Sequence, residues 1–115
     1  MIAEIVSLPG YENRVSALMD EDERMAMEFF IASTAENHPV MKETGGFRKA
    51  RWARPGGGKS GGFRVIYFFL SEPGRVFMAS IYPKSDKANL SAGERRILAS
   101  LSQQIRAASR KERER

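Results

Sequence analysis

The feature that most constrains the fold of this chain is a pair of apolar segments joined by a tight turn. Phe63–Leu70 reads FRVIYFFL and Arg75–Tyr82 reads RVFMASIY, with Glu72-Pro73-Gly74 between them. Two runs rich in β-branched and aromatic residues on either side of a Pro-Gly turn predict antiparallel neighbouring strands. Because Phe63–Leu70 is apolar on both faces, it is expected to be a central strand of its sheet.

Helix caps and apolar periodicity predict the remaining elements. Asp20 with Glu23, and Ser91 with Glu94, stand at capping-box spacing in front of apolar-periodic segments, so each pair marks the start of a helix. The elements predicted in chain order are strand 2–8, helix 11–19, helix 21–35, strand 47–53, strand 63–70, strand 75–82, and a final helix that begins after Ser91 and ends near Ala108.

The two longer helices each carry an apolar face for packing. It consists of Met25, Met27, Phe29, Phe30 and Ile31 in one helix, and of Ile97, Leu98, Leu101 and Ile105 in the other. The sequence therefore predicts one α+β domain, residues 1–108, with a small antiparallel-rich sheet of about four strands packed by two N-terminal helices and one C-terminal helix. Residues 109–115 contain no apolar side chain and are expected to form either a frayed helix end or a basic, flexible tail.

Composition limits the kinds of site that the chain can form. A length of 115 residues leaves room for one domain. The sequence has no cysteine, and a single histidine, His38, cannot supply a histidine zinc site within one chain, so no metal or cofactor is predicted. No apolar run approaches the roughly 20 residues that span a bilayer, so a cytoplasmic protein without a membrane partner is expected.

The charges are divided unevenly along the chain. Residues 1–41 hold eight acids and two bases, residues 42–87 hold ten bases and three acids, and residues 88–115 hold seven bases and three acids. A strongly basic middle segment favours a polyanionic partner, because cations that neutralise phosphates release condensed counterions. The alternative is that these charges only keep the surface soluble.

A glycine-rich loop separates two basic strands. Seven of the ten glycines fall between Gly45 and Gly62, where PGGGKSGG resembles a phosphate-binding P-loop. The pattern requires a glycine where this chain has Ala53, and the loop joins two strands instead of a strand and a helix, so nucleoside triphosphate binding is not expected. Lys59 in this loop is either a contact to a nucleic-acid backbone or a hairpin tip in solvent.

Strand alternation divides the basic residues of 47–54 between two faces. Phe47, Lys49, Arg51 and Ala53 fall on one face, and Arg48, Ala50, Trp52 and Arg54 on the other. Like charges on neighbouring positions of a sheet are unfavourable unless an anion lies between them, so an external phosphate is expected.

Other candidate residues lie on the following strands and loops. Arg64 shares its face with Ile66, and its partly desolvated guanidinium is suited to bidentate phosphate binding; an ion pair with an acid of the second helix is the alternative. Tyr82 either stacks on a base or closes the core, and Lys84 and Lys87 leave the sheet on a loop that can fold back over this surface. Two further residues are expected to be structural: Trp52 in the core, and His38 as a loop or capping residue and not a catalytic base.

Two phrases, KSGGFRVIY and YPKSDKANL, together with the order of elements to about Ile105, resemble the RelE/HigB-like family of type II toxin–antitoxin toxins, particularly its HigB branch. The resemblance implies a small α+β ribonuclease that enters the ribosomal A site, cuts the mRNA being decoded, and is silenced by a co-encoded antitoxin. It also implies a HigA-like, DNA-binding antitoxin, so that operator DNA is reached only through that partner.

The resemblance also implies roles for individual residues. Arg64 matches the arginine that holds the scissile phosphate, Lys49 with Arg51 matches the basic pair on the preceding strand, and Lys84 lies where the family often has a second catalytic cation. Some members have a tyrosine near the C-terminus that stacks on mRNA or assists proton transfer, but this chain reads Asn89-Leu90-Ser91 there.

The resulting hypothesis is a ribosome-dependent mRNA endonuclease that cuts by attack of the RNA 2′-hydroxyl on the adjacent phosphate. The expected catalytic residues are Arg64, Lys84 and Lys49. The expected RNA- or ribosome-binding residues are Arg51, Arg48, Arg54, Lys59, Lys87 and Tyr82. The main alternative is a non-catalytic RNA- or ribosome-binding module, because a basic sheet binds phosphates whether or not it cleaves them. A transcription regulator is disfavoured, since no helix-turn-helix pair is evident.

Overall fold

The computed structural model describes residues 2–54, 62–87 and 89–114. The elements within them occur in the predicted order, which confirms the α+β class. They are β1 (Glu4–Ser7), α1 (Tyr11–Leu18), α2 (Glu21–Ser33), β2 (Arg48–Trp52), β3 (Phe63–Leu70), β4 (Arg75–Pro83) and α3 (Ala92–Arg113). Helix α3 therefore continues past the expected limit near Ala108, and Ser109 is buried.

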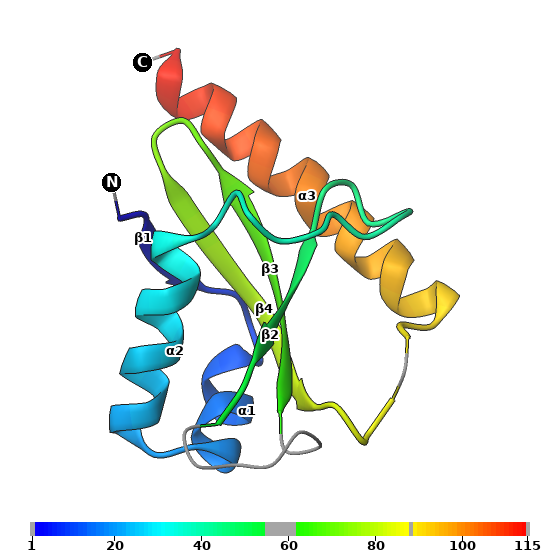
Figure 1. Cartoon of the computed structure of the whole chain (residues 1–115). Coiled ribbons are helices and arrows are strands. Elements are labelled where there is room, and N and C mark those ends of the chain that lie inside the picture. Colours follow the sequence, from blue (N-terminus) through cyan, green and yellow to red (C-terminus); the bar gives the residue numbers. More distant parts are fainter. Residues whose placement is uncertain (1, 55–61, 88, 115) are drawn as a thin grey trace.

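The four strands form one sheet in the order β1-β4-β3-β2 (Figure 1). Strand β3 pairs antiparallel with β4 and with β2, and β1 pairs parallel with β4. The hairpin across Glu72-Pro73-Gly74 and the central place of β3 are both confirmed. Five residues of β3, namely Phe63, Val65, Ile66, Tyr67 and Phe68, are buried, as expected for a strand that is covered on both faces.

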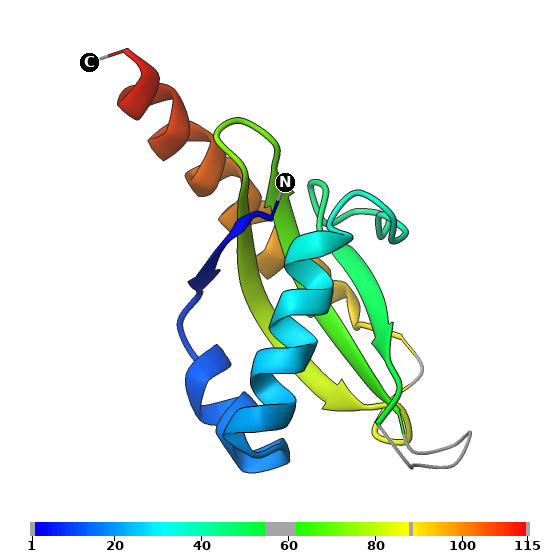
Figure 2. The same cartoon turned by 60° about the vertical axis from the view of Figure 1, so that its left-hand side comes forward.

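Helices cover both faces of the sheet and make a three-layer arrangement. Figure 2 shows α1 and α2 on one side of the strands and α3 on the other. The core under α1 and α2 includes Tyr11, Val15, Met27, Ile31, Ala50, Val65, Tyr67, Met78 and Ile81. The core under α3 consists of Phe47, Ile66, Phe68, Tyr82, Leu98 and Ile105. Both capping predictions are confirmed: Asp20 accepts from the Glu23 amide, and Ser91 and Glu94 form a complete capping box.

An irregularity in β4 changes which side chains share a face. Ile66 pairs with Ser80, but the next residue, Tyr67, pairs with Met78, so the register shifts between them. An extra residue in one strand reverses the alternation beyond it. As a result Ile81 enters the core under α1 and α2, and Tyr82 enters the core under α3.

The loop before β2 fixes α3 against the sheet. Arg95 Nη1 donates to the Lys42 carbonyl at 2.8 Å, and Arg106 Nη2 donates to the Gly45 carbonyl at 3.0 Å. Gly45 has φ of +74° and packs so closely on α3 that a Cβ built there lies 2.0 Å from Ser102 Oγ. The loop is thus a packed element of the fold, and its close approach to α3 requires glycine.

Part of the apolar face predicted for α2 is not used for packing. Met27 and Ile31 are buried, as expected, but Met25 is 62% exposed and Phe29 is 60% exposed. A helix on one face of a sheet buries only one stripe, and Met25 and Phe29 lie one turn apart outside that stripe. The expectation that both residues pack on the sheet is therefore wrong. Within the described ranges, no helix is long and apolar enough to cross a membrane.

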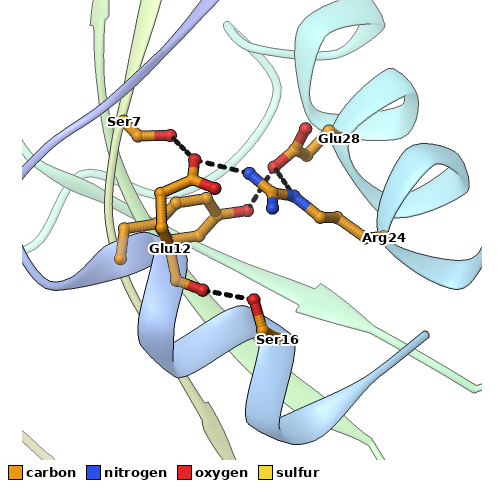
Figure 3. Close-up of polar contacts among 6 residues, drawn as sticks. Ser7, Glu12, Ser16, Arg24 and Glu28 are labelled. Carbon is orange, nitrogen blue, oxygen red and sulfur yellow. Dashed lines mark hydrogen bonds and ion pairs between the residues drawn. The ribbon is translucent and has the colours of Figure 1, made fainter. Parts of the chain in front are cut away.

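Charged groups link α1 to α2. Arg24 donates to Glu12 at 2.6 Å and to Glu28 at 3.0 Å, and Ser7 donates to the same Glu12 carboxylate (Figure 3). The buried Tyr11 hydroxyl donates to Glu28 at 2.6 Å. Because the network joins α1 to α2, it is expected to hold their relative orientation.

We expect acid to weaken this link. Hydrogen bonds from Arg24 and then from Ser7 lower the pKa of Glu12 from 4.5 to about 2. Because the folded-state pKa is below the usual value, the stabilisation is present above pH 4.5 and is lost as the pH falls towards 2. The melting temperature of the wild type should thus fall more steeply between these pH values than that of Glu12→Gln. Parallel curves for the two proteins, measured by circular dichroism, contradict the assignment.

Candidate functional site

Three of the predicted site residues line one cavity. A cavity of about 430 Å³ is bounded by His38, Pro39, Lys49, Arg51 and Arg64. Lys49 and Arg51 alternate along β2, and Arg51 pairs directly with Arg64 of β3. Both strands belong to a hydrogen-bonded sheet, so the backbone positions from which these cationic side chains extend are fixed relative to one another.

These cations share a sheet face with the core under α3. Lys49 pairs with Ile66, which lies in that core, and Phe47 is two residues before Lys49 on the same side of β2. Nearer the loop that joins β2 to β3, the same face carries Arg51 and Arg64 instead of apolar residues. The predicted alternation of β2 is confirmed, and the apolar half of this face anchors the basic half.

The cavity carries positive charge without a matching acid. Among the described residues, no carboxylate lies within ion-pair distance of Lys49, Arg51 or Arg64. The alternative of an ion pair between Arg64 and the second helix is therefore not realised, since α2 covers the opposite face of the sheet. Two arginines directly across a strand pair repel each other, so an anion bound between them is the stabilising arrangement.

Two other arginines of this region point away from the cavity. Arg54 forms an ion pair with Glu23 at 3.0 Å and lies over the Phe63 ring. Arg48 donates to the Glu36 and His38 carbonyls at 3.1 and 2.8 Å. Both stabilise the side of the sheet that α2 covers, so the structure does not bring them together with the cavity residues.

Trp52, on the same strand, belongs to the core. Trp52 packs against the core under α1 and α2, as predicted, and its Nε1 donates to Glu23 at 3.1 Å. Lys59 lies outside the described residues.

Tyr82 closes the core next to the cavity. Its side chain is 1% exposed, opposite Arg64 in the register, so in this structure its ring is covered and does not offer a stacking surface. Burial raises the pKa of its hydroxyl, and within the described part of the chain that hydroxyl has no hydrogen-bond partner.

The loop after β4 carries two further cations with different surroundings. Lys87 Nζ lies 5.0 Å from the centre of the Tyr82 ring and 2.5 Å from a Glu94 oxygen. Lys84 has an exposed side chain, and its amide donates to the Gly62 carbonyl at 3.0 Å. Lys84 thus stands at the same end of the sheet as Arg64, but neither lysine lines the cavity.

His38 lines the cavity although the sequence predicts only a loop or capping role for it. Its Nε2 lies 2.8 Å from Thr34 Oγ1, and that hydroxyl gives its single proton to the Phe30 carbonyl at 2.7 Å. When the hydroxyl proton is directed at that carbonyl, the matching tautomer of His38 has its hydrogen on Nε2 and an acceptor at Nδ1. Burial, and then the Arg48 guanidinium, lower the pKa of His38, which favours the neutral form of the ring.

A backbone contact explains why His38 is near the cations. Lys49 donates its amide to the Pro39 carbonyl at 3.0 Å, so the segment after α2 runs along the outer edge of β2. In the sequence, the only signal was the proline after His38. It predicted the end of the helix, but not that the following segment pairs with β2.

The chemistry available here is that of cations on a rigid support. Guanidinium groups hold phosphate oxygens in a bidentate manner and stabilise charge that develops on them. Among the residues that the structure describes, no group of three or more His, Cys, Asp or Glu side chains is arranged to hold a metal ion. The cavity is suited to an anionic ligand with several oxygens.

A comparison with protein families finds a match over most of the chain. A family model described as the RelE toxin of the RelE/RelB toxin–antitoxin system matches residues 12–115 of the chain. The match includes all of α1 except Tyr11, as well as α2, the strands that carry the cavity, and α3.

Proposed function

From the premise that this chain belongs to the RelE toxin family of RelE/RelB toxin–antitoxin systems, we propose that it is a HigB-like, ribosome-dependent mRNA endonuclease. The observation that carries the proposal is the cavity in which Lys49, Arg51 and Arg64 converge without a carboxylate partner among the described residues. A phosphodiester supplies the missing negative charge. Its cleavage is a reaction that cations placed in this way accelerate.

Arg64 is the phosphate clamp in this proposal. It is part of the central strand, it is half-buried, and it stands between Arg51 on β2 and Tyr82 on β4. A guanidinium held in this way keeps its orientation while charge builds up on the phosphorane, which favours the transition state over the bound substrate. Lys49 and Arg51 bind adjacent backbone oxygens, and Lys84 neutralises charge at the same end of the sheet.

The reaction is a transesterification within the RNA. The 2′-oxygen forms a bond to the adjacent phosphorus, the bond from phosphorus to the 5′-oxygen breaks, and the products carry a 2′,3′-cyclic phosphate and a 5′-hydroxyl. One proton leaves the 2′-hydroxyl and one is delivered to the departing 5′-oxygen. Lys49 and Lys84 are the candidates for these transfers on this chain.

The biological setting follows from the family. A RelE-family toxin has a cognate antitoxin, which we propose to be HigA-like and to carry the contact with operator DNA. We place the toxin in the cytoplasm, where ribosomes and mRNA are available. The competing function is a module that blocks translation by binding RNA or the ribosome without cutting, since the same cations support binding alone.

Mapping of mRNA 5′ ends in a purified translation reaction tests the proposal. With wild-type toxin, we expect new 5′-hydroxyl ends within codons when ribosomes are present and none when ribosomes are omitted. Blocked translation with intact mRNA supports the binding module instead. Cleavage that proceeds equally well without ribosomes shows a free ribonuclease and overturns the ribosome dependence.

A further inference from the structure

The outer face of α2 carries an apolar stripe that nothing in the described part of the chain covers. Met25 and Phe29 are one helical turn apart and are 62% and 60% exposed. Ile2 is 59% exposed and lies near the end of the same helix, because the amide of the next residue, Ala3, donates to the Ala32 carbonyl. Large apolar side chains exposed together on one surface are typical of an interaction site.

A cavity continues this stripe at the C-terminal end of α2. It has a volume of about 320 Å³ and is bounded by Ala3, Ala32, Ala35, Phe69 and residues of the loop after α2. Ala32 and Ser33, which line it, follow Phe29 by three and four positions and therefore lie next to it on the helix. The stripe and the cavity form one surface, which we call the α2 surface.

The charge of the α2 surface is opposite to that of the cavity lined by Lys49, Arg51 and Arg64, which we call the RNA-binding cavity. Glu21 and Asp22 are exposed at the start of α2, and Glu36 lines the cavity at its other end. Residues 1–41 contain eight acids and only two bases, and one of those bases, Arg24, is already paired with Glu12 and Glu28. A segment that covers Met25 and Phe29 therefore meets negative charge at both ends.

We propose that the α2 surface docks a cationic, apolar segment of the cognate antitoxin. The inference rests on the toxin–antitoxin pairing of the proposed function, and it names the surface and the chemistry of the partner. Apolar anchors of the segment cover Met25 and Phe29 and enter the cavity beside Ala32, while its Lys or Arg residues face Glu21, Asp22 and Glu36.

The α2 surface and the RNA-binding cavity lie on opposite sides of the sheet. Helix α2 packs on the face of the sheet that carries Ala50 and Val65, whereas Lys49 and Arg64 belong to the opposite face. A segment on α2 therefore does not compete with RNA for the cavity cations.

The test uses the full-length toxin and its co-encoded antitoxin. In Met25→Lys/Phe29→Lys, apolar contact is removed and positive charge is added to a surface that binds a cationic segment. Lysine is also compatible with an exposed helix, so the fold should persist. We expect the dissociation constant, measured by titration calorimetry, to rise at least about 100-fold, with mRNA cleavage unchanged and no longer inhibited by antitoxin.

Two matched variants complete the design. Ile97→Lys changes a residue of α3 that is 63% exposed, and we expect its antitoxin affinity and inhibition to match the wild type. In Lys49→Glu the charge of the RNA-binding cavity is changed, and its antitoxin affinity is expected to stay within about threefold of the wild type, whatever happens to cleavage.

The outcomes separate this proposal from the proposed function. Unchanged affinity of Met25→Lys/Phe29→Lys overturns the docking surface, and so does a large loss of affinity in Lys49→Glu without one in the α2 variant. If the α2 variant unfolds, Glu21→Lys/Asp22→Lys replaces it, with a rise in dissociation constant as the supporting result and no change as the contrary one. If the endonuclease proposal is wrong, wild-type toxin leaves mRNA uncut. The measured affinity between toxin and antitoxin does not depend on that result.

Discussion

Replacement of Arg64 by alanine is expected to lower the rate of mRNA cleavage on the ribosome by about 10²–10³-fold, the range seen when a single preorganised charge-stabilising donor is removed. The side chain is half-buried on the central strand, opposite Arg51, and lines the proposed RNA-binding cavity. Its loss breaks no ion pair among the described residues, and it relieves repulsion with Arg51. The melting temperature should therefore change little, while single-turnover cleavage slows strongly.

Two variants make the Arg64 result specific. Arg54→Ala removes the same kind of side chain from the same region, but Arg54 is paired with Glu23 on the other face, so cleavage should stay within about threefold of wild type. Arg64→Lys keeps the charge but loses the planar fork, and an intermediate rate is expected. If Arg64→Ala cleaves at the wild-type rate in a folded state, Arg64 is not the phosphate clamp.

Gly45→Ala is expected to destabilise the protein by about 3 kcal/mol, from backbone strain and overpacking together. Gly45 has φ of +74°, and an added Cβ lies 2.0 Å from Ser102 Oγ, 2.9 Å from Ser102 Cβ and 3.4 Å from Ala99 Cα. Ser102 is buried and its hydroxyl donates to the Ala99 carbonyl, so it cannot move away without losing that bond. For a domain of this size, we expect the melting temperature to fall by about 10 °C.

The two sources of this cost can be separated. Gly10 also has a positive φ, +91°, but nothing lies within 4 Å of its added Cβ, so Gly10→Ala should cost only about 1 kcal/mol. In Gly45→Ala/Ser102→Gly the closest clash is absent, and the double variant should be less destabilised than the sum of the single ones. Denaturant unfolding of the wild type, Gly10→Ala, Gly45→Ala, Ser102→Gly and the double variant measures these costs, and equal costs for Gly10→Ala and Gly45→Ala would show that the packing of the loop on α3 is unimportant.

Much of the fold was predictable because it depends on local signals. The Pro-Gly turn and the apolar run FRVIYFFL predicted the hairpin, and the N-caps Asp20 and Ser91 predicted the helix starts. Alternation in β2 correctly separated Lys49 and Arg51 from Arg48 and Arg54. The sequence left open whether the segment after Ala108 is a helix end or a tail, because it contains no apolar residue; in the structure α3 continues to Arg113 and Ser109 is buried.

Other features depend on partners that are distant in the sequence. The register shift in β4 decides that Tyr82, and not Ile81, shares the face of Arg64, and nothing in the residues around Ser80 indicates it. Met25 and Phe29 have the spacing of a buried stripe, but the orientation of α2 on the sheet leaves them exposed. His38 reaches the cavity because the segment after α2 pairs with the outer edge of β2.

The sequence by itself determined the order of the elements, the face on which each cation of β2 lies, and the excess of positive charge between residues 42 and 87. Those properties follow from periodicity, capping and composition, which act between neighbours along the chain. Only the tertiary structure decided that Lys49, Arg51 and Arg64 share one cavity, that Arg48 and Arg54 serve the opposite face, and that α2 presents an acidic, apolar surface. The reason is physical: strand register, helix rotation and loop packing are set by contacts between distant segments, and these contacts form only when the whole core is assembled.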